Sequence, residues 1–151
     1  MTKNADKLKA LKSINTEYLT KSEAKEFTIL LEELTKREFQ EKSTSTFMDF
    51  VTSIWKEFIT GDHHVKMAKA FDDIASGKLK RLIINMPPRH TKSEFASYLL
   101  PAWMVGRNPK LKIIQATHTG ELAIRFGRKA KNLIDSEEYA KIFKTRLQEG
   151  S

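Results

Sequence analysis

The sequence predicts an α/β fold, in which a parallel sheet is flanked by helices and preceded by an N-terminal helical segment. Two short apolar runs are typical of buried strands: one begins at Leu82, and the other covers residues 111–116. Each precedes a segment, 92–105 and 121–134, whose apolar residues recur at helical spacing. Strand, loop, helix, strand and helix in this order form a βαβα unit, which implies parallel strands joined by right-handed crossovers.

The N-terminal third is predicted to be helical. Over residues 16–41 apolar side chains are spaced by three, four or their sums among Glu and Lys. Residues 41–46 are expected to form a polar linker that offers N-cap candidates for the next helix. Helices are then predicted over 47–59 and over 62–75, the second ending at Ser76-Gly77. We therefore expect a helical segment and linker at 1–45 and a second domain at 46–151.

The segment Met86-Pro87-Pro88-Arg89-His90-Thr91-Lys92-Ser93 carries the strongest functional signal. A strand-like run ends in a polar loop, and the loop ends in Lys-Ser at the start of a predicted helix. Pro87 and Pro88 favour an extended chain and keep the helix from starting early. The helix that follows has an apolar face, formed by Phe95, Tyr98, Leu99 and Trp103.

This layout is that of a phosphate-binding loop. Backbone N–H groups can cradle a polyphosphate there, Lys92 can reach the β- and γ-phosphates, and the Ser93 hydroxyl can ligate Mg²⁺. The usual pattern G-x-x-x-x-G-K-[ST] lacks both glycines, because Met86 and Thr91 stand at those positions. Since Thr is β-branched, Thr91 is expected to have φ below 0° unless it is strained.

The residues RLIINMPPRHTKSEFASYLLPAWMVGRNP and the run KLKIIQATHTGELAIRFGRKAKNLIDSEEYAKIF resemble the ATPase domain of tailed-bacteriophage terminase large subunits. The resemblance covers roughly residues 47–147, and its most specific part is PPRHTKSE, which such proteins often have as PPRHGKSE. It implies an incomplete P-loop NTPase fold that binds ATP and Mg²⁺. It also implies a motor that moves double-stranded DNA into the procapsid, with an endonuclease in the full-length protein.

The resemblance also assigns roles to individual residues. Lys92 is expected to bind phosphate and Ser93 to hold Mg²⁺, while Arg89 would stabilise charge on the γ-phosphoryl group, so that Arg89 and Lys92 are the expected catalytic residues. Glu94 is expected to interact favourably with the helix dipole rather than to act as a base. The cofactor-binding set is Pro88, Arg89, His90, Thr91, Lys92, Ser93, Glu94 and His64.

Other residues near this motif have two interpretations each. His63 or His64 could read the adenine edge or could pack at a helix N-terminus, and their spacing does not resemble a zinc site. Phe47 or Phe50 could stack on a base or belong to the core. Residues 117–119, Thr-His-Thr, follow the second predicted strand, where α/β folds place ligands, and could face the site or DNA.

The positive charge is concentrated in the C-terminal half. Residues 79–151 contain 14 Lys and Arg against 6 Asp and Glu, while the whole chain has a net charge of +8. Such a bias suits a nucleotide or a DNA backbone, although a solvated helix face explains it equally well. The basic residues in question lie on the predicted helix 121–134, opposite its apolar side chains: Arg125, Arg128, Lys129 and Lys131.

Expected partners follow from the resemblance: double-stranded DNA, a terminase small subunit, a portal protein and further copies in a ring, expected to be a pentamer. The chain has no cysteine, no apolar run long enough for a membrane span and no signal-peptide pattern in MTKNADKLKA. We therefore expect the host cytoplasm, and transiently the portal vertex of the procapsid, as its location.

A motor ATPase also needs an apolar strand that ends in Asp, with a Glu beside it to activate water. No such run follows residues 111–116, and no cluster of nuclease carboxylates is found. The chain is thus expected to be the N-terminal part of a terminase large subunit that binds Mg·ATP but does not turn it over alone. Two alternatives remain: another P-loop enzyme, such as a nucleic-acid translocase or a small-molecule kinase, or a non-catalytic basic module that binds DNA or a partner.

Overall fold

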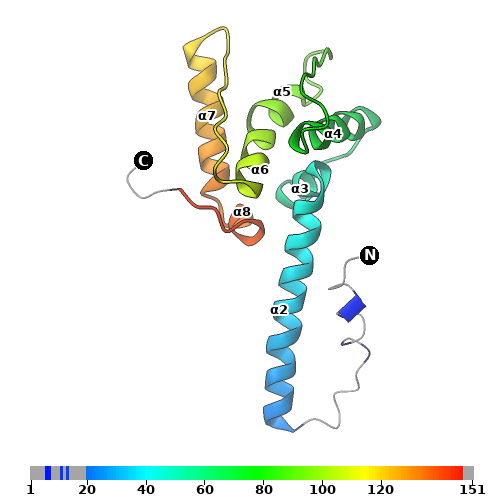
Figure 1. The fold of residues 1–151 in the computed structure, drawn as a ribbon. Coiled ribbons are helices and arrows are strands. Elements are labelled where there is room, and N and C mark those ends of the chain that lie inside the picture. Colours follow the sequence, from blue (N-terminus) through cyan, green and yellow to red (C-terminus); the bar gives the residue numbers. More distant parts are fainter. Residues whose placement is uncertain (1–5, 8–10, 12, 14–19, 148–151) are drawn as a thin grey trace. The chain divides into compact units, whose positions relative to one another are not determined.

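The computed structural model describes residues 6–7, 11, 13 and 20–147, and the elements of this part are helical (Figure 1). The chain divides into two compact units, Met1–Lys42 and Ser43–Ser151. The helices, in order, are α2 (Lys21–Ser45), α3 (Phe47–Ile54), α4 (Asp62–Ala75), α5 (Lys92–Glu94), the π-helical turn η2 (Phe95–Leu99), α6 (Leu100–Arg107), α7 (Gly120–Ile134) and α8 (Glu137–Ile142).

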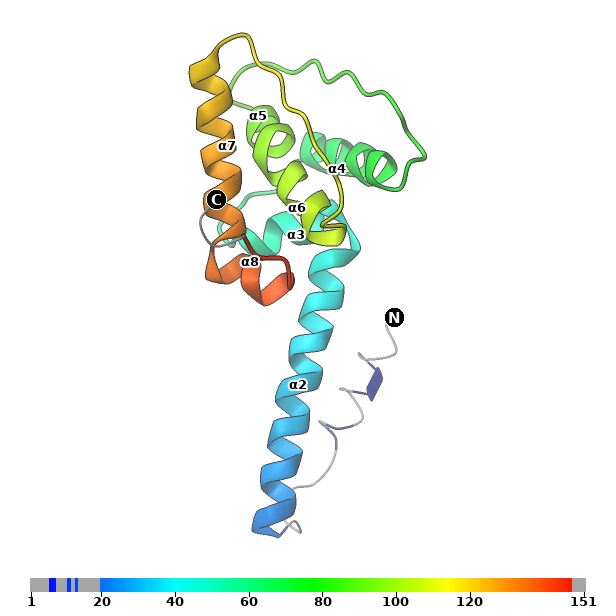
Figure 2. The ribbon, with the colours of Figure 1, turned by 60° about the vertical axis from the view of Figure 1, so that its left-hand side comes forward.

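The prediction of a parallel sheet is wrong, because the described elements are all helices. Residues 79–88 and 111–117 belong to neither helix nor strand, and they run as long irregular traces in Figure 2. A strand exists only when its backbone N–H and C=O groups pair with a neighbour, and neither run finds one in the described part of the chain. Ile84 and Met86 still pack against the core, while Ile83 and Ile114 are 94% and 96% exposed.

The first unit contains most of α2, whose start follows from its sequence. Thr20 and Glu23 form a reciprocal cap: the Thr20 N–H donates to Glu23 Oε2 at 2.9 Å, and the Glu23 N–H donates to Thr20 Oγ1 at 3.4 Å. Further along, Glu33 and Arg37 pair at 2.6 Å across one turn. Residues 16–19 of the predicted helix lie outside the described residues. Of the predicted linker 41–46, residues 41–45 are helical, because α2 continues to Ser45, and only Thr46 lies between α2 and α3, as the N-cap of α3.

The second unit is organised around aromatic side chains. Phe47 is fully buried, and its ring meets those of Phe71, Phe95 and Trp103 edge to face at centroid distances of 5.1, 5.4 and 5.6 Å. These four residues come from α3, α4, η2 and α6. Phe47 and Phe50 are therefore core residues, and neither is exposed to stack on a base.

The helix after the loop contains a π-helical turn with an identifiable cause. Pro101 has no N–H to donate to the carbonyl four residues earlier, and its ring crowds that carbonyl. Over Phe95–Leu99 the helix widens instead, and the Leu100 N–H donates to the Phe95 carbonyl. The predicted helix 92–105 is thus one continuous helical segment of three labelled parts, reaching Arg107.

The C-terminal elements pack on this helix. α8 was not predicted, although Ser136 followed by two glutamates is an N-cap signal, and its hydroxyl accepts from the Tyr139 N–H at 3.3 Å. The buried Tyr139 hydroxyl donates to the Ala102 carbonyl at 2.8 Å, and burial raises the Tyr139 pKa to about 12. Gly106 makes this approach possible, because a Cβ there would lie 2.6 Å from Tyr139 Oη and from Phe143.

A matched pair of glycine substitutions tests this packing. Gly106→Ala should lower the free energy of unfolding by about 1–3 kcal/mol, since α6 and α8 must separate to admit the methyl group. Gly127→Ala, the same change in α7 with nothing within 4 Å, should raise it by up to about 1 kcal/mol through helix propensity. Urea denaturation of both variants measures the two effects. Equal behaviour would contradict the close approach of α8 to α6.

Candidate functional site

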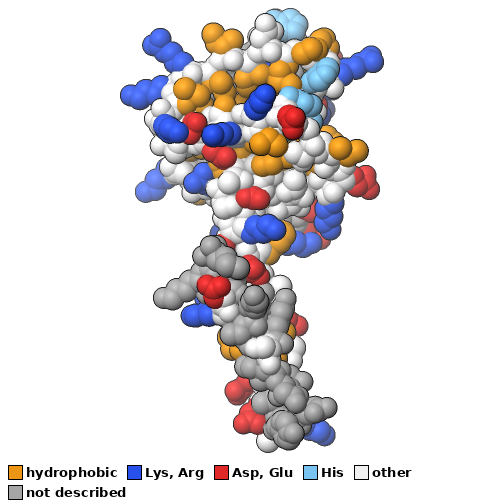
Figure 3. Space-filling view, turned by 90° about the vertical axis from the view of Figure 1, so that its right-hand side faces the viewer, with side chains coloured by type: hydrophobic (Ala, Val, Ile, Leu, Met, Phe, Trp, Pro, Cys, Tyr) orange, Lys and Arg blue, Asp and Glu red, His pale blue; other side chains and the backbone are white. Residues whose placement is uncertain are grey.

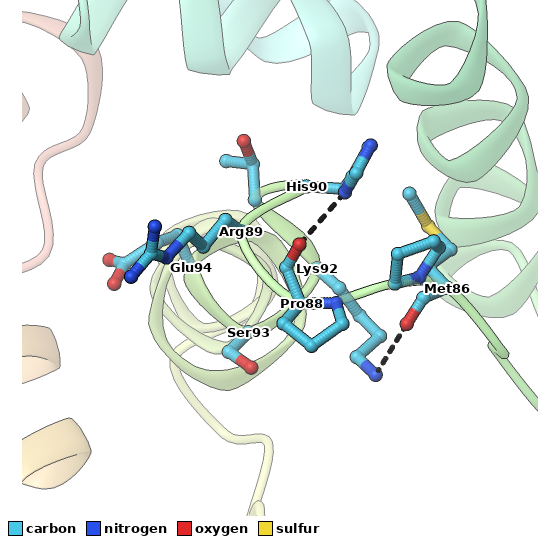
Figure 4. Close-up of a pocket in the computed structure, with 9 residues that line it drawn as sticks. Met86, Pro88, Arg89, His90, Lys92, Ser93 and Glu94 are labelled. Atoms are coloured by element: carbon cyan, nitrogen blue, oxygen red, sulfur yellow. Dashed lines mark hydrogen bonds between the residues drawn. The ribbon is translucent and has the colours of Figure 1, made fainter.

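Residues 86–94, called loop 86–94 from here on, surround one pocket of about 410 Å³ (Figure 4). Every loop residue in the predicted cofactor-binding set lines it, from Pro88 to Glu94. No sheet positions this loop in the described part of the chain. Met86 packs against the core at one end, and the fully buried Phe95 follows the loop at the other.

The loop backbone alternates in handedness. Arg89 has φ 65° and Thr91 has φ 60°, and these are the only positive values among the described residues other than glycine, so that His90 between them has a negative φ. Alternation of right-handed and left-handed residues is the backbone pattern found in anion-binding concavities. The expectation of a negative φ for Thr91 is wrong, and a β-branched residue in this conformation is strained.

Two hydrogen bonds within the loop help to hold this conformation (Figure 4). His90 Nδ1 lies 2.9 Å from the Pro88 carbonyl. A carbonyl can only accept, so this nitrogen carries the proton. The Lys92 side chain turns back along the loop, and its Nζ donates to the Met86 carbonyl at 3.4 Å. That bond is long, and the Lys92 ammonium can exchange it for a stronger bond to an anion.

Ser93 and Glu94 are the last two residues of the loop and lie in the first helical turn, α5. Ser93, the predicted Mg²⁺ ligand, is exposed and lines the pocket next to Lys92. Both Glu94 carboxylate oxygens accept from Lys129 Nζ at 2.8 Å, across 35 residues of sequence. No sequence signal indicated Lys129 as the partner, because its spacing from Glu94 is not local.

Histidines gather beside the loop. The His63 ring lies 3.8 Å from that of His64 and 5.7 Å from that of His90, linking the start of α4 to the loop. Figure 3 shows this face, with histidine side chains next to an apolar surface. In the described part of the chain no group of three or more His, Asp or Glu side chains is placed to hold a metal ion.

His64 itself acts as a helix cap. It is 7% exposed, and its Nδ1 accepts the Gly61 N–H at 3.0 Å. The proton is therefore on Nε2, which is buried and has no hydrogen-bond partner within the described residues. Burial, with the nearby His63 and His90, lowers the His64 pKa. His64 does not line the pocket, so the structure agrees with the helix N-terminal interpretation.

The other candidates are not among the residues that line the pocket. Thr119 is the N-cap of α7 and accepts the Leu122 N–H at 3.3 Å, while Thr117 Oγ1 donates to the Thr119 carbonyl at 2.6 Å. A shallow groove of about 730 Å³ runs along α7. It is lined by basic residues beside the 62% exposed Ile124: Arg125, Arg128 and Lys129.

None of the described helices is both long enough and apolar enough to cross a bilayer. Comparison of the chain with protein-family models, with curated proteins and with solved structures gives no match.

The lowered pKa of His64 predicts a stability change with pH. Above about pH 6.5 the imidazole is neutral in both folded and unfolded chains and contributes no penalty. Below it, the unfolded chain binds a proton that the folded chain resists, so the free energy of unfolding falls as pH drops from about 6.5 toward the lowered pKa. His64→Gln keeps an acceptor for Gly61 and should flatten this dependence, as followed by urea titration between pH 7.5 and 5.

His118→Gln, the same change at an exposed position, is the matched control. A steep fall that persists unchanged in His64→Gln would assign the pH dependence to another group.

The strain at Thr91 predicts a stabilising substitution. Thr91→Gly should raise the free energy of unfolding by about 0.5–1 kcal/mol, because relief of the left-handed conformation exceeds the entropy that glycine adds to the unfolded chain. Thr28→Gly, in the middle of α2, should lower it through helix propensity. Thermal unfolding compares the two. Destabilisation by Thr91→Gly would show that the left-handed φ is not a real cost.

Proposed function

We propose that loop 86–94, the polyanion loop from here on, binds the polyphosphate of Mg·ATP, and that the chain is the ATP-binding part of a DNA-packaging motor of the terminase large-subunit type. The observation that carries the first part is the alternating backbone at Arg89, His90 and Thr91, next to the Lys92 ammonium and the Ser93 hydroxyl in one pocket. Backbone N–H groups, a cation and a hydroxyl are the donors and the ligand that a magnesium-bound phosphate needs.

The division of labour follows from the chemistry of each group. Lys92 would bind phosphate as a point charge, and Arg89, which is exposed at the loop, would stabilise charge on the γ-phosphoryl group. Mg·ATP would supply the phosphoanhydride bond that is hydrolysed, with Mg²⁺ bound to the phosphate oxygens. Hydrolysis would also need a carboxylate to activate water, and Glu94, the acid that lines the pocket, is tied to Lys129.

The motor assignment rests on the sequence motif PPRHTKSE with PAW and GRNP, together with the basic surface of α7. This assignment implies that the motor moves double-stranded DNA. It also implies that the chain binds the small subunit, the portal and further copies of itself in a ring. In such a system the protein works in the host cytoplasm and at the portal vertex.

Nucleotide titration tests the proposed function. Isothermal titration of the purified chain with Mg·ATP should give saturable binding, and Lys92→Ala should weaken it by at least about tenfold, because a charged hydrogen-bond donor to phosphate is lost. Lys80→Ala, at an exposed position before the loop, is the matched control. Equal affinities of wild type and Lys92→Ala would refute the loop as the binding site and favour a basic binding module.

DNA binding gives a second, independent test. If α7 meets the duplex backbone, affinity should be sequence-independent and fall with salt, with a log–log slope of roughly −0.9 for each phosphate contact. Reversing Arg125, Arg128 and Lys131 to Glu should flatten that slope. A control with the same change of charge reverses exposed lysines elsewhere, Lys56, Lys66 and Lys69, and fluorescence anisotropy with a duplex measures both. The same slope in both triple variants would mean that the effect is one of net charge alone.

A further inference from the structure

Glu94 raises an electrostatic problem for the polyanion loop. It follows Ser93 directly, and it is the one carboxylate among the residues that line the pocket. A free carboxylate there would repel a polyphosphate, since like charges at this range are only partly screened by water and salt.

Lys129 forms an ion pair with Glu94 and neutralises its charge. Its Nζ lies 2.8 Å from both oxygens of Glu94, and the two side chains are only 37% and 30% exposed. The ammonium also lies 5.2 Å from the centroid of the Tyr98 ring, one turn beyond Glu94 on the same helical segment. Lys129 is thus held at two points by the helix that begins at the loop.

The direction of the Glu94 side chain agrees with this arrangement. In Figure 4 the Glu94 carboxylate lies on the other side of the loop from the Lys92 ammonium. A partly buried ion pair is screened less by water and salt than an exposed one, and is therefore stronger. Lys129 therefore both neutralises the charge and keeps it turned away from Lys92.

We propose that Lys129 is a positioning residue that shields Glu94 and thereby makes the polyanion loop able to bind a polyphosphate. This inference rests on the proposed function of the loop. It assigns to α7 a part in nucleotide binding that does not require α7 to touch the nucleotide.

A double-mutant cycle distinguishes the shield from a simple structural brace. Lys129→Met should weaken Mg·ATP binding by roughly three- to tenfold at low salt, because the negative charge of Glu94 near the phosphates is no longer neutralised by a cation. Glu94→Gln should bind at least as tightly as wild type. The double variant should recover to within about twofold of wild type, because no charge remains to be shielded. If the Lys129–Glu94 pair only stabilises the local structure, both single variants should weaken binding and the double variant should not recover.

Two further measurements sharpen the result. The deficit of Lys129→Met should shrink as salt rises, since screening replaces the lost shield, and Lys129→Arg should bind like wild type because it keeps the cation. Lys112→Met, the same change at an exposed position, controls for the loss of one positive charge. Melting curves confirm that each variant is folded at the temperature of titration.

The outcomes separate the two proposals. If wild type binds Mg·ATP and Lys92→Ala does not, but the double variant stays as weak as Lys129→Met, the shield is refuted and the loop stands. If wild type and Lys92→Ala bind Mg·ATP equally, the loop itself is refuted, and the shield with it.

Discussion

The position of loop 86–94 depends on the burial of Phe95. This side chain is fully buried two residues after Ser93, and its ring lies 5.4 Å from Phe47, 5.3 Å from Phe58 and 5.3 Å from His64. Burial of an aromatic ring of this size stabilises the fold by about 1.5–3 kcal/mol. Because Phe95 contacts side chains from α3, from the segment after it and from α4, the chain leaving the loop is anchored by the core.

Sequence patterns predicted the elements that depend on local spacing. α4 has the predicted bounds, Asp62–Ala75, and α7 begins one residue before its predicted start, since both have strong apolar periodicity and clear end signals. α3 ends at Ile54, five residues before the predicted end at 59, and the Trp55 and Phe58 rings then pack 5.0 Å apart across a turn. The strands failed because pairing is non-local: an apolar run specifies a strand only where a neighbour exists.

The candidate site divides in the same way. The loop residues from Pro88 to Glu94 were predicted together because they are contiguous, and they line one pocket. The contacts that join the loop to other elements, Glu94 with Lys129 and His90 with His63, are separated by 35 and 27 positions in sequence. The left-handed φ of Thr91 was missed because the rule against β-branched residues describes the cost of that conformation and not what the surroundings can impose.

The strain in the loop has a physical consequence for binding. Two residues other than glycine in left-handed conformations cost on the order of 1–3 kcal/mol each, yet the local bonds that oppose this cost are two contacts to loop carbonyls, from His90 and Lys92. The Lys92 bond is the weaker, at 3.4 Å. An anion that accepted from the backbone N–H groups and from Lys92 would replace that bond with charge-assisted ones. Under the proposed function, binding of the polyphosphate would therefore also stabilise the strained conformation of the loop.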